Sequence, residues 1–175
     1  MTRARAVALA LLALVATARR GSAQFNNASI NATADIITVG MTVTTLSNLN
    51  FGSVPKGVAT TVLPTAAGAG EWQVSGNKNA FVSITFTLPT QLANIQAAPG
   101  SNMPISFSAT SAIWNRQVNN PGAGTVFDPN VGTTGRFGSA ATPLLFIWIG
   151  GTVNPAAGAK PGIYQGTIIV TLTYL

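Results

Sequence analysis

Three carboxylates, Asp35, Glu71 and Asp128, are the side chains of this sequence that could carry acid–base chemistry. Histidine and cysteine are absent from the sequence, which removes the commonest metal ligands, the usual general base and the thiol nucleophile. Two carboxylates that face one substrate can hydrolyse a glycosidic bond. Because these three lie far apart in the sequence, we expect isolated surface acids, no enzymatic activity, and no cofactor or metal.

Tryptophan offers a second kind of chemistry, because its aromatic face can pack against a ligand while its N–H finds a polar partner. The candidates are Trp72, Trp114 and Trp148. Trp148 lies in the most apolar run of the sequence, so we expect it in the core. Trp114 lies beside a long turn-rich segment and is the better ligand candidate. A secreted, self-contained β-sandwich that binds carbohydrate or a surface polymer is therefore the alternative function.

The first residues of the sequence predict a signal peptide. Residues 1–5 are basic, and residues 6–18 form an apolar stretch that is too short to span a bilayer. Small residues favour cleavage after Ala23, and a competing site follows Ala18. We therefore expect export by the Sec pathway, transit through the periplasm, a final location outside the cell, and no membrane span in the mature chain.

Removal of residues 1–23 changes the charge balance. Four of the nine basic residues lie in that segment, so five remain against three acidic residues, a net charge of +2. The remaining five are scattered singly along the chain: Lys56, Lys78, Arg116, Arg136 and Lys160. Because they form no basic run, we expect no nucleic-acid partner.

The elements that must position these side chains are predicted to be strands. The mature chain, of about 150 residues, has the size of one domain and is rich in Thr, Val, Ile, Ala, Gly and Asn. Short apolar or alternating runs separated by turns lie at residues 58–63, 71–76, 81–88, 104–114 and 144–149. This spacing predicts an immunoglobulin-like Greek-key β-sandwich, in which residues 144–149 form a central strand buried on both faces.

The longest turn-rich segment covers residues 115–138. It contains repeated Gly and Pro and no periodic pattern. It is expected to be a mobile surface loop, or alternatively a loop for subunit contact or display.

The last fourteen residues, 162–175, predict one long strand. Apolar side chains alternate onto one face: Tyr164, Ile168, Val170, Leu172 and Tyr174. Gly162 is the fourteenth residue from the end, and Tyr174 is the penultimate one. Because chain ends normally fray, so strong a strand at this place suggests a recognition surface as well as a core element.

A second alternating segment lies at residues 28–35, where Ala28, Ile30, Ala32 and Ala34 share one face. The alternation changes phase at Ile36-Ile37 and continues with the opposite parity over residues 37–46. A one-residue slip moves every side chain to the other face of a sheet. Either a β-bulge lies at this point, or two separate strands serve two separate cores.

A series of short motifs in a fixed order resembles a known family. The motifs are Leu49-Asn50-Phe51-Gly52-Ser53-Val54, Trp72-Gln73-Val74-Ser75-Gly76, Val82-Ser83-Ile84-Thr85-Phe86-Thr87-Leu88-Pro89, Ile149-Gly150-Gly151-Thr152 and Pro161-Gly162-Ile163-Tyr164-Gln165-Gly166-Thr167, followed by the penultimate Tyr174. Together they resemble the cysteine-free pilin-like family catalogued as a domain of unknown function, which is akin to archaic (alternative) chaperone–usher fimbrial subunits. The resemblance covers nearly the whole mature chain.

The resemblance implies a sandwich that lacks its final strand and receives one from the next subunit, by donor-strand complementation. It divides the chain into a signal peptide (1–23), a donor-strand extension (24–36) and a pilin-like sandwich (37–175). The implied donor side chains are Phe25, Ala28, Ile30, Ala32 and Ala34. The implied acceptor groove, which a chaperone would also recognise, contains Gly162, Ile168, Val170, Leu172 and Tyr174. The expected function is a structural subunit of an extracellular pilus or fimbria. Its partners would be other copies of itself, a periplasmic chaperone and an outer-membrane usher.

Overall fold

The computed structural model describes residues 27–36, 40–96 and 101–175. The predicted signal peptide and Phe25 lie outside these residues. The described chain is built from strands and a single 3₁₀ turn. In chain order they are β1 (Asn27–Ile36), β2 (Thr42–Ser47), β3 (Leu49–Ser53), β4 (Thr60–Val62), β5 (Gly70–Ser75), β6 (Phe81–Thr87), β7 (Gln91–Asn94), β8 (Asn102–Ser106), β9 (Ala112–Arg116), η1 (Pro121–Ala123), β10 (Thr125–Phe127), β11 (Thr133–Arg136), β12 (Leu144–Ile149), β13 (Gly151–Val153) and β14 (Tyr164–Tyr174).

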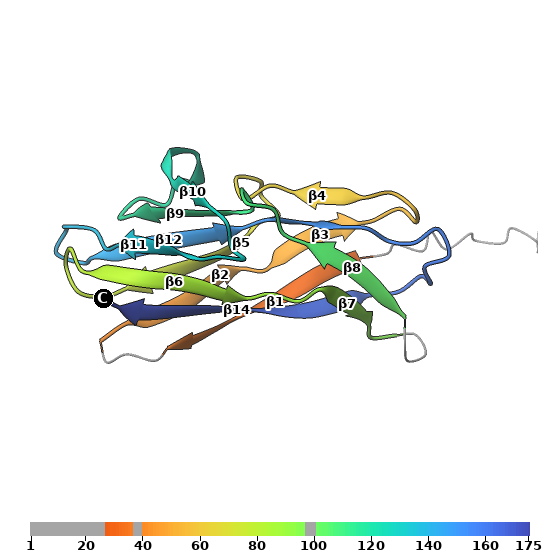
Figure 1. Cartoon of the computed structure of the whole chain (residues 1–175), viewed down its shortest axis with the longest axis horizontal. Helices are drawn as coiled ribbons and strands as arrows, with labels where there is room; N and C mark the ends of the chain where they lie inside the picture. Colours follow the sequence, from red (N-terminus) through yellow and green to blue (C-terminus); the bar gives the residue numbers. More distant parts are fainter. Residues whose placement is uncertain (1–26, 37–39, 97–100) are drawn as a thin grey trace, which may run out of the picture.

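The strands form two sheets (Figure 1). The small sheet has the order β10-β9-β12-β5-β2. The large sheet follows the path β11-β6-β14-β7-β8-β13-β4, and β1 and β3 join it along the other edge of β14. This arrangement confirms the predicted all-β sandwich. The position beside β14, which we expected a neighbouring subunit to fill, is occupied in the single chain by its own β1.

One hydrophobic core lies between the two sheets. The small sheet contributes Trp72, Leu145 and Ile147, and the large sheet contributes inward-facing residues such as Ile84 and Ile168. Aromatic contacts cross the core, since the ring of Phe86 on β6 lies 5.8 Å from that of Trp72 and 6.2 Å from that of Phe127. The core thus joins the large sheet, which carries β14, to the small sheet.

Strand β12 is buried on both faces, as the apolar run predicted. Leu145 and Ile147 face the main core, whereas Phe146 and Trp148 form a separate cluster with Ile113. The rings of Phe146 and Trp148 stack with centroids 6.0 Å apart. Trp148 is therefore buried, as expected, but in a second cluster rather than in the main core.

Residues 115–138 contain more regular structure than the sequence suggested. Within this segment β10 pairs with β9, and β11 pairs with β6 in the other sheet. The intervening η1 turn is capped by Asn120, whose side chain accepts a hydrogen bond from the backbone N–H of Gly122. The sequence did not predict these strands, because strands of three and four residues are too short to show a periodic pattern.

The change of phase near Ile36 coincides with a change of sheet. Strand β1 belongs to the large sheet and ends at Ile36, whereas β2 belongs to the small sheet and begins at Thr42. Residues 37–39 lie outside the described chain. Two separate strands are therefore present, rather than one strand with a β-bulge. They do not serve separate cores, because Ile30 of β1 lies in the same buried cluster against which Val43 of β2 packs.

Candidate functional site: the groove beside β14

Strand β14 is the longest strand described, and its inner face forms the floor of the candidate site. Tyr164, Ile168, Val170 and Leu172 are buried, in agreement with the predicted alternation. One edge of β14 pairs antiparallel with β6 and β7. Its other edge is the one that an added strand must use.

Strand β1 occupies that edge (Figure 1). It pairs parallel to β14 from Ala28 opposite Tyr164 to Ile36 opposite Leu172. Ala28 and Ile30 are only 1% and 0% exposed, so this strand fills a position in the core. The same register places Ala32 opposite Ile168 and Ala34 opposite Val170. The structure therefore brings four of the predicted donor residues beside three of the predicted groove residues, Ile168, Val170 and Leu172, within one chain.

The far wall of the groove is β3, which pairs antiparallel with the first part of β1. The register covers Asn27 to Ile30 and shifts between Ala28 and Ser29. Leu49 and Phe51 on β3 are buried in the same cluster as Ile30. Beyond Ile30, β14 is the only described strand that pairs with β1. The groove is thus bounded by two strands at one end and by one strand at the other.

Ile30 is the one large side chain among the predicted donor residues that the structure describes, and it lies opposite Gly166. A Cβ atom on Gly166 would lie 2.7 Å from Cδ2 of Leu92, closer than van der Waals contact allows. Leu92 is itself fully buried. The absence of a side chain at Gly166 thus makes room for Leu92, and it leaves Ile30 without a side chain opposite it on β14. Sequence reasoning did not single out Gly166 or Leu92, although a glycine on the apolar face of a strand is a signal for close packing.

Gly162 does not lie in the wall of the groove; it forms the corner before β14. Its φ of +149° favours glycine, and a Cβ atom there would lie 2.5 Å from the side-chain amide of Asn94. That amide donates a hydrogen bond of 3.2 Å to the carbonyl of Pro161. Gly162 therefore sets the path by which the chain enters β14.

Tyr174 anchors the other end of β14. Its hydroxyl accepts a 2.8 Å hydrogen bond from the backbone N–H of Asn77, in the turn between β5 and β6. Its ring lies 6.0 Å from the ring of Phe137. Because β1 ends opposite Leu172, Tyr174 fixes the end of the strand rather than contributing to the part of the groove that β1 covers.

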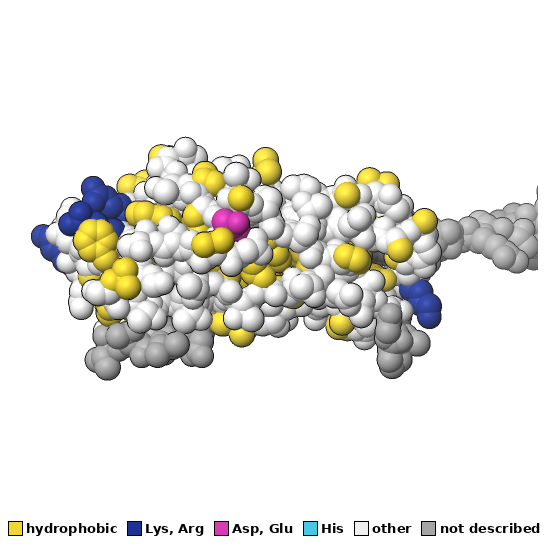
Figure 2. All heavy atoms as spheres, in the orientation of Figure 1, with side chains coloured by type: hydrophobic (Ala, Val, Ile, Leu, Met, Phe, Trp, Pro, Cys, Tyr) yellow, Lys and Arg dark blue, Asp and Glu magenta, His cyan; other side chains and the backbone are white. Residues whose placement is uncertain are grey.

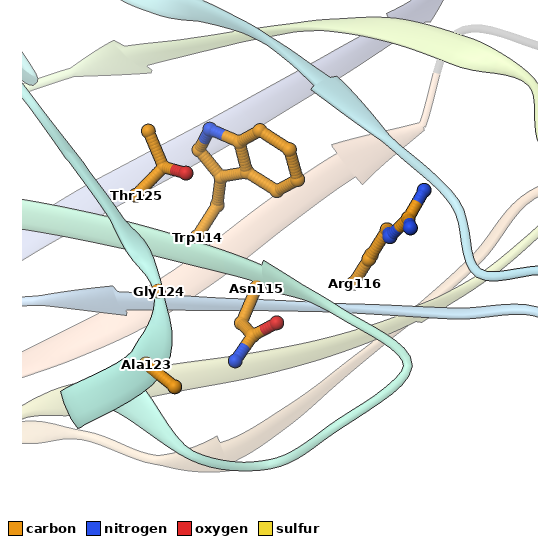
Figure 3. A pocket seen from close by; sticks show the side chains of 6 residues that line it. All are labelled: Trp114, Asn115, Arg116, Ala123, Gly124 and Thr125. Atoms are coloured by element: carbon orange, nitrogen blue, oxygen red, sulfur yellow. The ribbon is translucent and has the colours of Figure 1, made fainter.

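Trp114 lies at a different place, where β9 ends beside the η1 turn (Figure 3). A cavity of about 210 Å³ is lined there by Trp114, Asn115, Arg116, Ala123, Gly124 and Thr125. The indole of Trp114 is half-buried and packs against the main core, and its Nε1 has no hydrogen-bond partner. The volume is below the roughly 300–1,000 Å³ typical of small-molecule pockets. Trp72 is fully buried in the main core and offers no stacking surface.

The described carboxylates hold local structure. Oε1 of Glu71 accepts a 2.6 Å hydrogen bond from the side-chain amide of Asn119. Oδ1 of Asp128 accepts hydrogen bonds from the backbone N–H and the side-chain amide of Asn130, which closes a turn. The side chain of Asp35 is outside the described part. Within the described ranges, no three potential metal-binding side chains come together.

Charge is sparse on the surface that Figure 2 shows, and the Lys and Arg side chains visible there lie toward the two ends of the molecule. No helix in residues 27–36, 40–96 or 101–175 is long and apolar enough to cross a membrane. Uncharged polar side chains and backbone, drawn white, cover most of this face between the two ends, with scattered hydrophobic side chains among them (Figure 2). The most distinctive feature of the fold is the position of β1 between β14 and β3.

Comparison with known proteins identifies the family of the chain. No curated protein is significantly similar to it. The model of a domain of unknown function, DUF4402, matches residues 39–174, a range that begins just after β1 and includes β2 to β14. This match covers most of the sequence, and the chain therefore belongs to the DUF4402 family.

Proposed function

We propose that this protein is the structural subunit of an extracellular pilus or fimbria whose subunits join by strand insertion. The observation that carries the proposal is the position of β1. This strand lies at the start of the described chain, pairs with β14 and completes the core there. The residues matched by the family model begin after this strand. Since every copy of the chain has the same groove and the same strand, the β1 of one molecule fits the groove of another.

The contacts of β1 are sufficient for a firm junction. Burial of one Ile side chain contributes about 1.5–3 kcal/mol, and each backbone hydrogen bond adds about 0.5–1.5 kcal/mol net. The ladder with β14 extends from Ala28 to Ile36, and Ile30 is fully buried within it. Several such hydrogen bonds and the buried Ile together favour the inserted strand and oppose the cost of ordering it.

The same geometry accounts for the partners that the family resemblance implies. Without β1, the edge of β14 and the buried side chains of Ile168 and Val170 would face solvent. An open hydrophobic edge pairs with other chains and aggregates. On this proposal, a subunit whose β1 has left its own groove needs a chaperone at that groove in the periplasm, and an usher at the outer membrane to control the exchange of strands.

The alternative is a secreted, self-contained β-sandwich that binds carbohydrate or a surface polymer. Two observations favour it: β1 closes its own sandwich, and a small cavity lies beside Trp114. That cavity offers an aromatic ring, the Asn115 amide and the Arg116 guanidinium. Substitution of the exposed Arg116 by Ala would weaken glycan binding under this alternative and leave filaments unaffected under the proposed function.

Deletion of residues 24–35 tests the proposal, with secreted material examined by electron microscopy and size exclusion. We expect filaments from the intact chain, and aggregates or chaperone-bound subunits from the deletion variant. Ile30→Asp should also prevent assembly, because it places a charge in the core. Asn31→Asp is the matched control, since Asn31 is adjacent and exposed. A deletion variant that is a stable monomer, identical in behaviour to the intact chain, would rule out the filament.

A further inference from the structure

We propose that the end of the molecule at which β14 finishes is a binding surface for an acidic polysaccharide, a polymer whose sugars carry carboxylate groups. Its centre is the guanidinium of Arg136 on the ring of Phe81, and Lys78 and Arg116 lie at the same end. The surface shares no residue with the ladder between β1 and β14. This inference goes beyond strand insertion and holds for the single chain.

The centre of the surface is a guanidinium whose position is fixed. Arg136, the last residue of β11, pairs with Phe81, the first residue of β6. Its Cζ atom lies 4.9 Å from the centroid of the Phe81 ring, and its Nε donates a 3.1 Å hydrogen bond to the carbonyl of Asn79. No hydrogen bond to the described residues uses its two Nη groups. The guanidinium is thus held in place, and its paired donors face a carboxylate of a ligand with both N–H groups available.

The fold brings a second arginine to this end, although the two are far apart in the sequence. The carbonyl of Leu144 accepts 3.0 Å hydrogen bonds from the backbone N–H groups of both Gln117 and Gly138. These residues follow Arg116 by one position and Arg136 by two, so the strands that carry the two arginines end beside each other. Figure 2 shows Lys and Arg side chains gathered at this end, with hydrophobic side chains beside them.

The turn between β5 and β6 completes the surface. It carries the exposed Lys78 and the exposed amide of Asn77. Phe81 is 50% exposed, so part of its ring is available to the apolar face of a sugar. Leu175 also lies here, since its N–H donates a 3.1 Å hydrogen bond to the carbonyl of Phe81, and its carboxylate offsets one of the three positive charges. An aromatic ring, an amide and an excess of positive charge together suit an acidic sugar.

The described carboxylate side chains lie away from this surface. Glu71 is near the start of β5, whereas the turn with Lys78 follows the end of that strand. Asp128 follows β10, whose last residue pairs with Ala112 at the start of β9, whereas Arg116 is at the end of β9. These two acids therefore do not cancel the attraction of the surface for an anion.

The arrangement favours a polysaccharide over two other anionic partners. Three cations around one ring form no continuous track for the phosphates of a nucleic acid. The exposed amide of Asn77 suits the hydroxyl groups of a sugar rather than the apolar interior of a membrane. A single contact of this kind is weak, because both partners are exposed to water. A polymer binds more firmly, since its many carboxylates remain close to the surface after one of them dissociates.

The test measures binding of the full chain to polygalacturonate by biolayer interferometry, with neutral dextran as the control polymer. We expect the chain to bind polygalacturonate, with an affinity that falls as salt is added, and not to bind dextran. Because single chains are measured, the result is independent of whether the chain forms filaments.

Four variants locate the site, and thermal unfolding checks that each keeps its fold. Arg136→Gln should weaken binding about fivefold, the order of one exposed charged pair. Arg136→Lys should also weaken it, because the charge remains but the planar pair of donors is lost. Lys78→Gln, in an exposed turn, should weaken it about twofold. Lys56→Gln is the matched control, since it removes the same charge from an exposed turn between β3 and β4 and should leave the affinity unchanged.

Absence of binding to polygalacturonate would overturn the inference. Equal losses in Lys56→Gln and Arg136→Gln would also overturn it, because they would indicate unspecific attraction to net charge. Tighter binding to vesicles of anionic phospholipid than to polygalacturonate would assign the surface to a membrane instead. A loss in Arg116→Ala without any loss in Arg136→Gln would place the site in the cavity beside Trp114 and contradict the proposal.

Discussion

Ile30 of β1 lies opposite Gly166 of β14 in the parallel ladder that completes the core. Moving β1 by two residues along β14 would bring Ile30 opposite Tyr164 or Ile168, where a large side chain already occupies the core face. The pairing of the largest described donor side chain with the one glycine of β14 therefore favours this register. The other described donor, Ala28, is small and adds little to this selection.

Gly166→Ala should destabilise the protein by about 1–3 kcal/mol, because the new methyl group would overpack against Leu92. Urea unfolding measures the change. Thr167→Ala is the matched control, since Thr167 is the next residue and is exposed, so its change should be within about 0.5 kcal/mol. Equal effects of the two substitutions would contradict the tight packing behind Gly166.

Ile30→Ala should cost about 2–5 kcal/mol of unfolding free energy, because it leaves a cavity between the two sheets. Hydrogen exchange should also become faster along the edge of β14 that pairs with β1. Asn31→Ala, at an exposed position of the same strand, should leave both measurements nearly unchanged. If Ile30→Ala behaved like its neighbour, β1 would not be part of the core.

Gly162→Ala should destabilise the corner before β14 by about 1–3 kcal/mol, because its φ of +149° is strained for any residue with a side chain. The Cβ atom would also collide with the amide of Asn94. Gly158→Ala is the control, since no atom lies within 4 Å of a Cβ placed there and its φ is not positive. Thermal unfolding that ranks Gly158→Ala as the more damaging change would refute this account of the corner.

Tyr174→Phe should cost about 0.5–1.5 kcal/mol, the net contribution of one hydrogen bond, here the one from the Asn77 N–H. Tyr174→Ala should cost more, because it also removes the ring that contacts Phe137. Denaturant unfolding of both variants gives the ranking. Identical losses would show that the hydroxyl contributes nothing measurable.

Local patterns predicted much of the fold. The alternation in residues 162–175 identified the buried face of β14, and the apolar run of β12 predicted a strand buried on both faces. The change of phase near Ile36 marked the boundary between strands of two different sheets. In each case the signal lies within a few consecutive residues, where side-chain alternation is visible.

Other features depend on residues far apart in the chain and were missed. The pairing of Ile30 with Gly166 is set by register across most of the sequence, and neither residue indicates the other. The short strands β10 and β11 form because β9 and β6 provide edges for them. The sequence predicted that Trp148 is buried but not that it lies in a second cluster, because an apolar run does not show that its two faces contact different clusters.

The central claim is that β1 of one molecule fills the groove of another, and single-cysteine variants test it directly. One preparation carries Gln165→Cys, and a second, tagged preparation carries Ser29→Cys or Asn31→Cys. Since each chain then has one cysteine, a disulfide between the two kinds of chain forms above the level of random collision only if the strand of one reaches the groove of the other. We predict that mixed assembly gives this cross-linked pair in high yield, and that Thr61→Cys, at an exposed position of β4, gives it only at background level. A yield from both β1 positions no higher than that of Thr61→Cys would contradict the account.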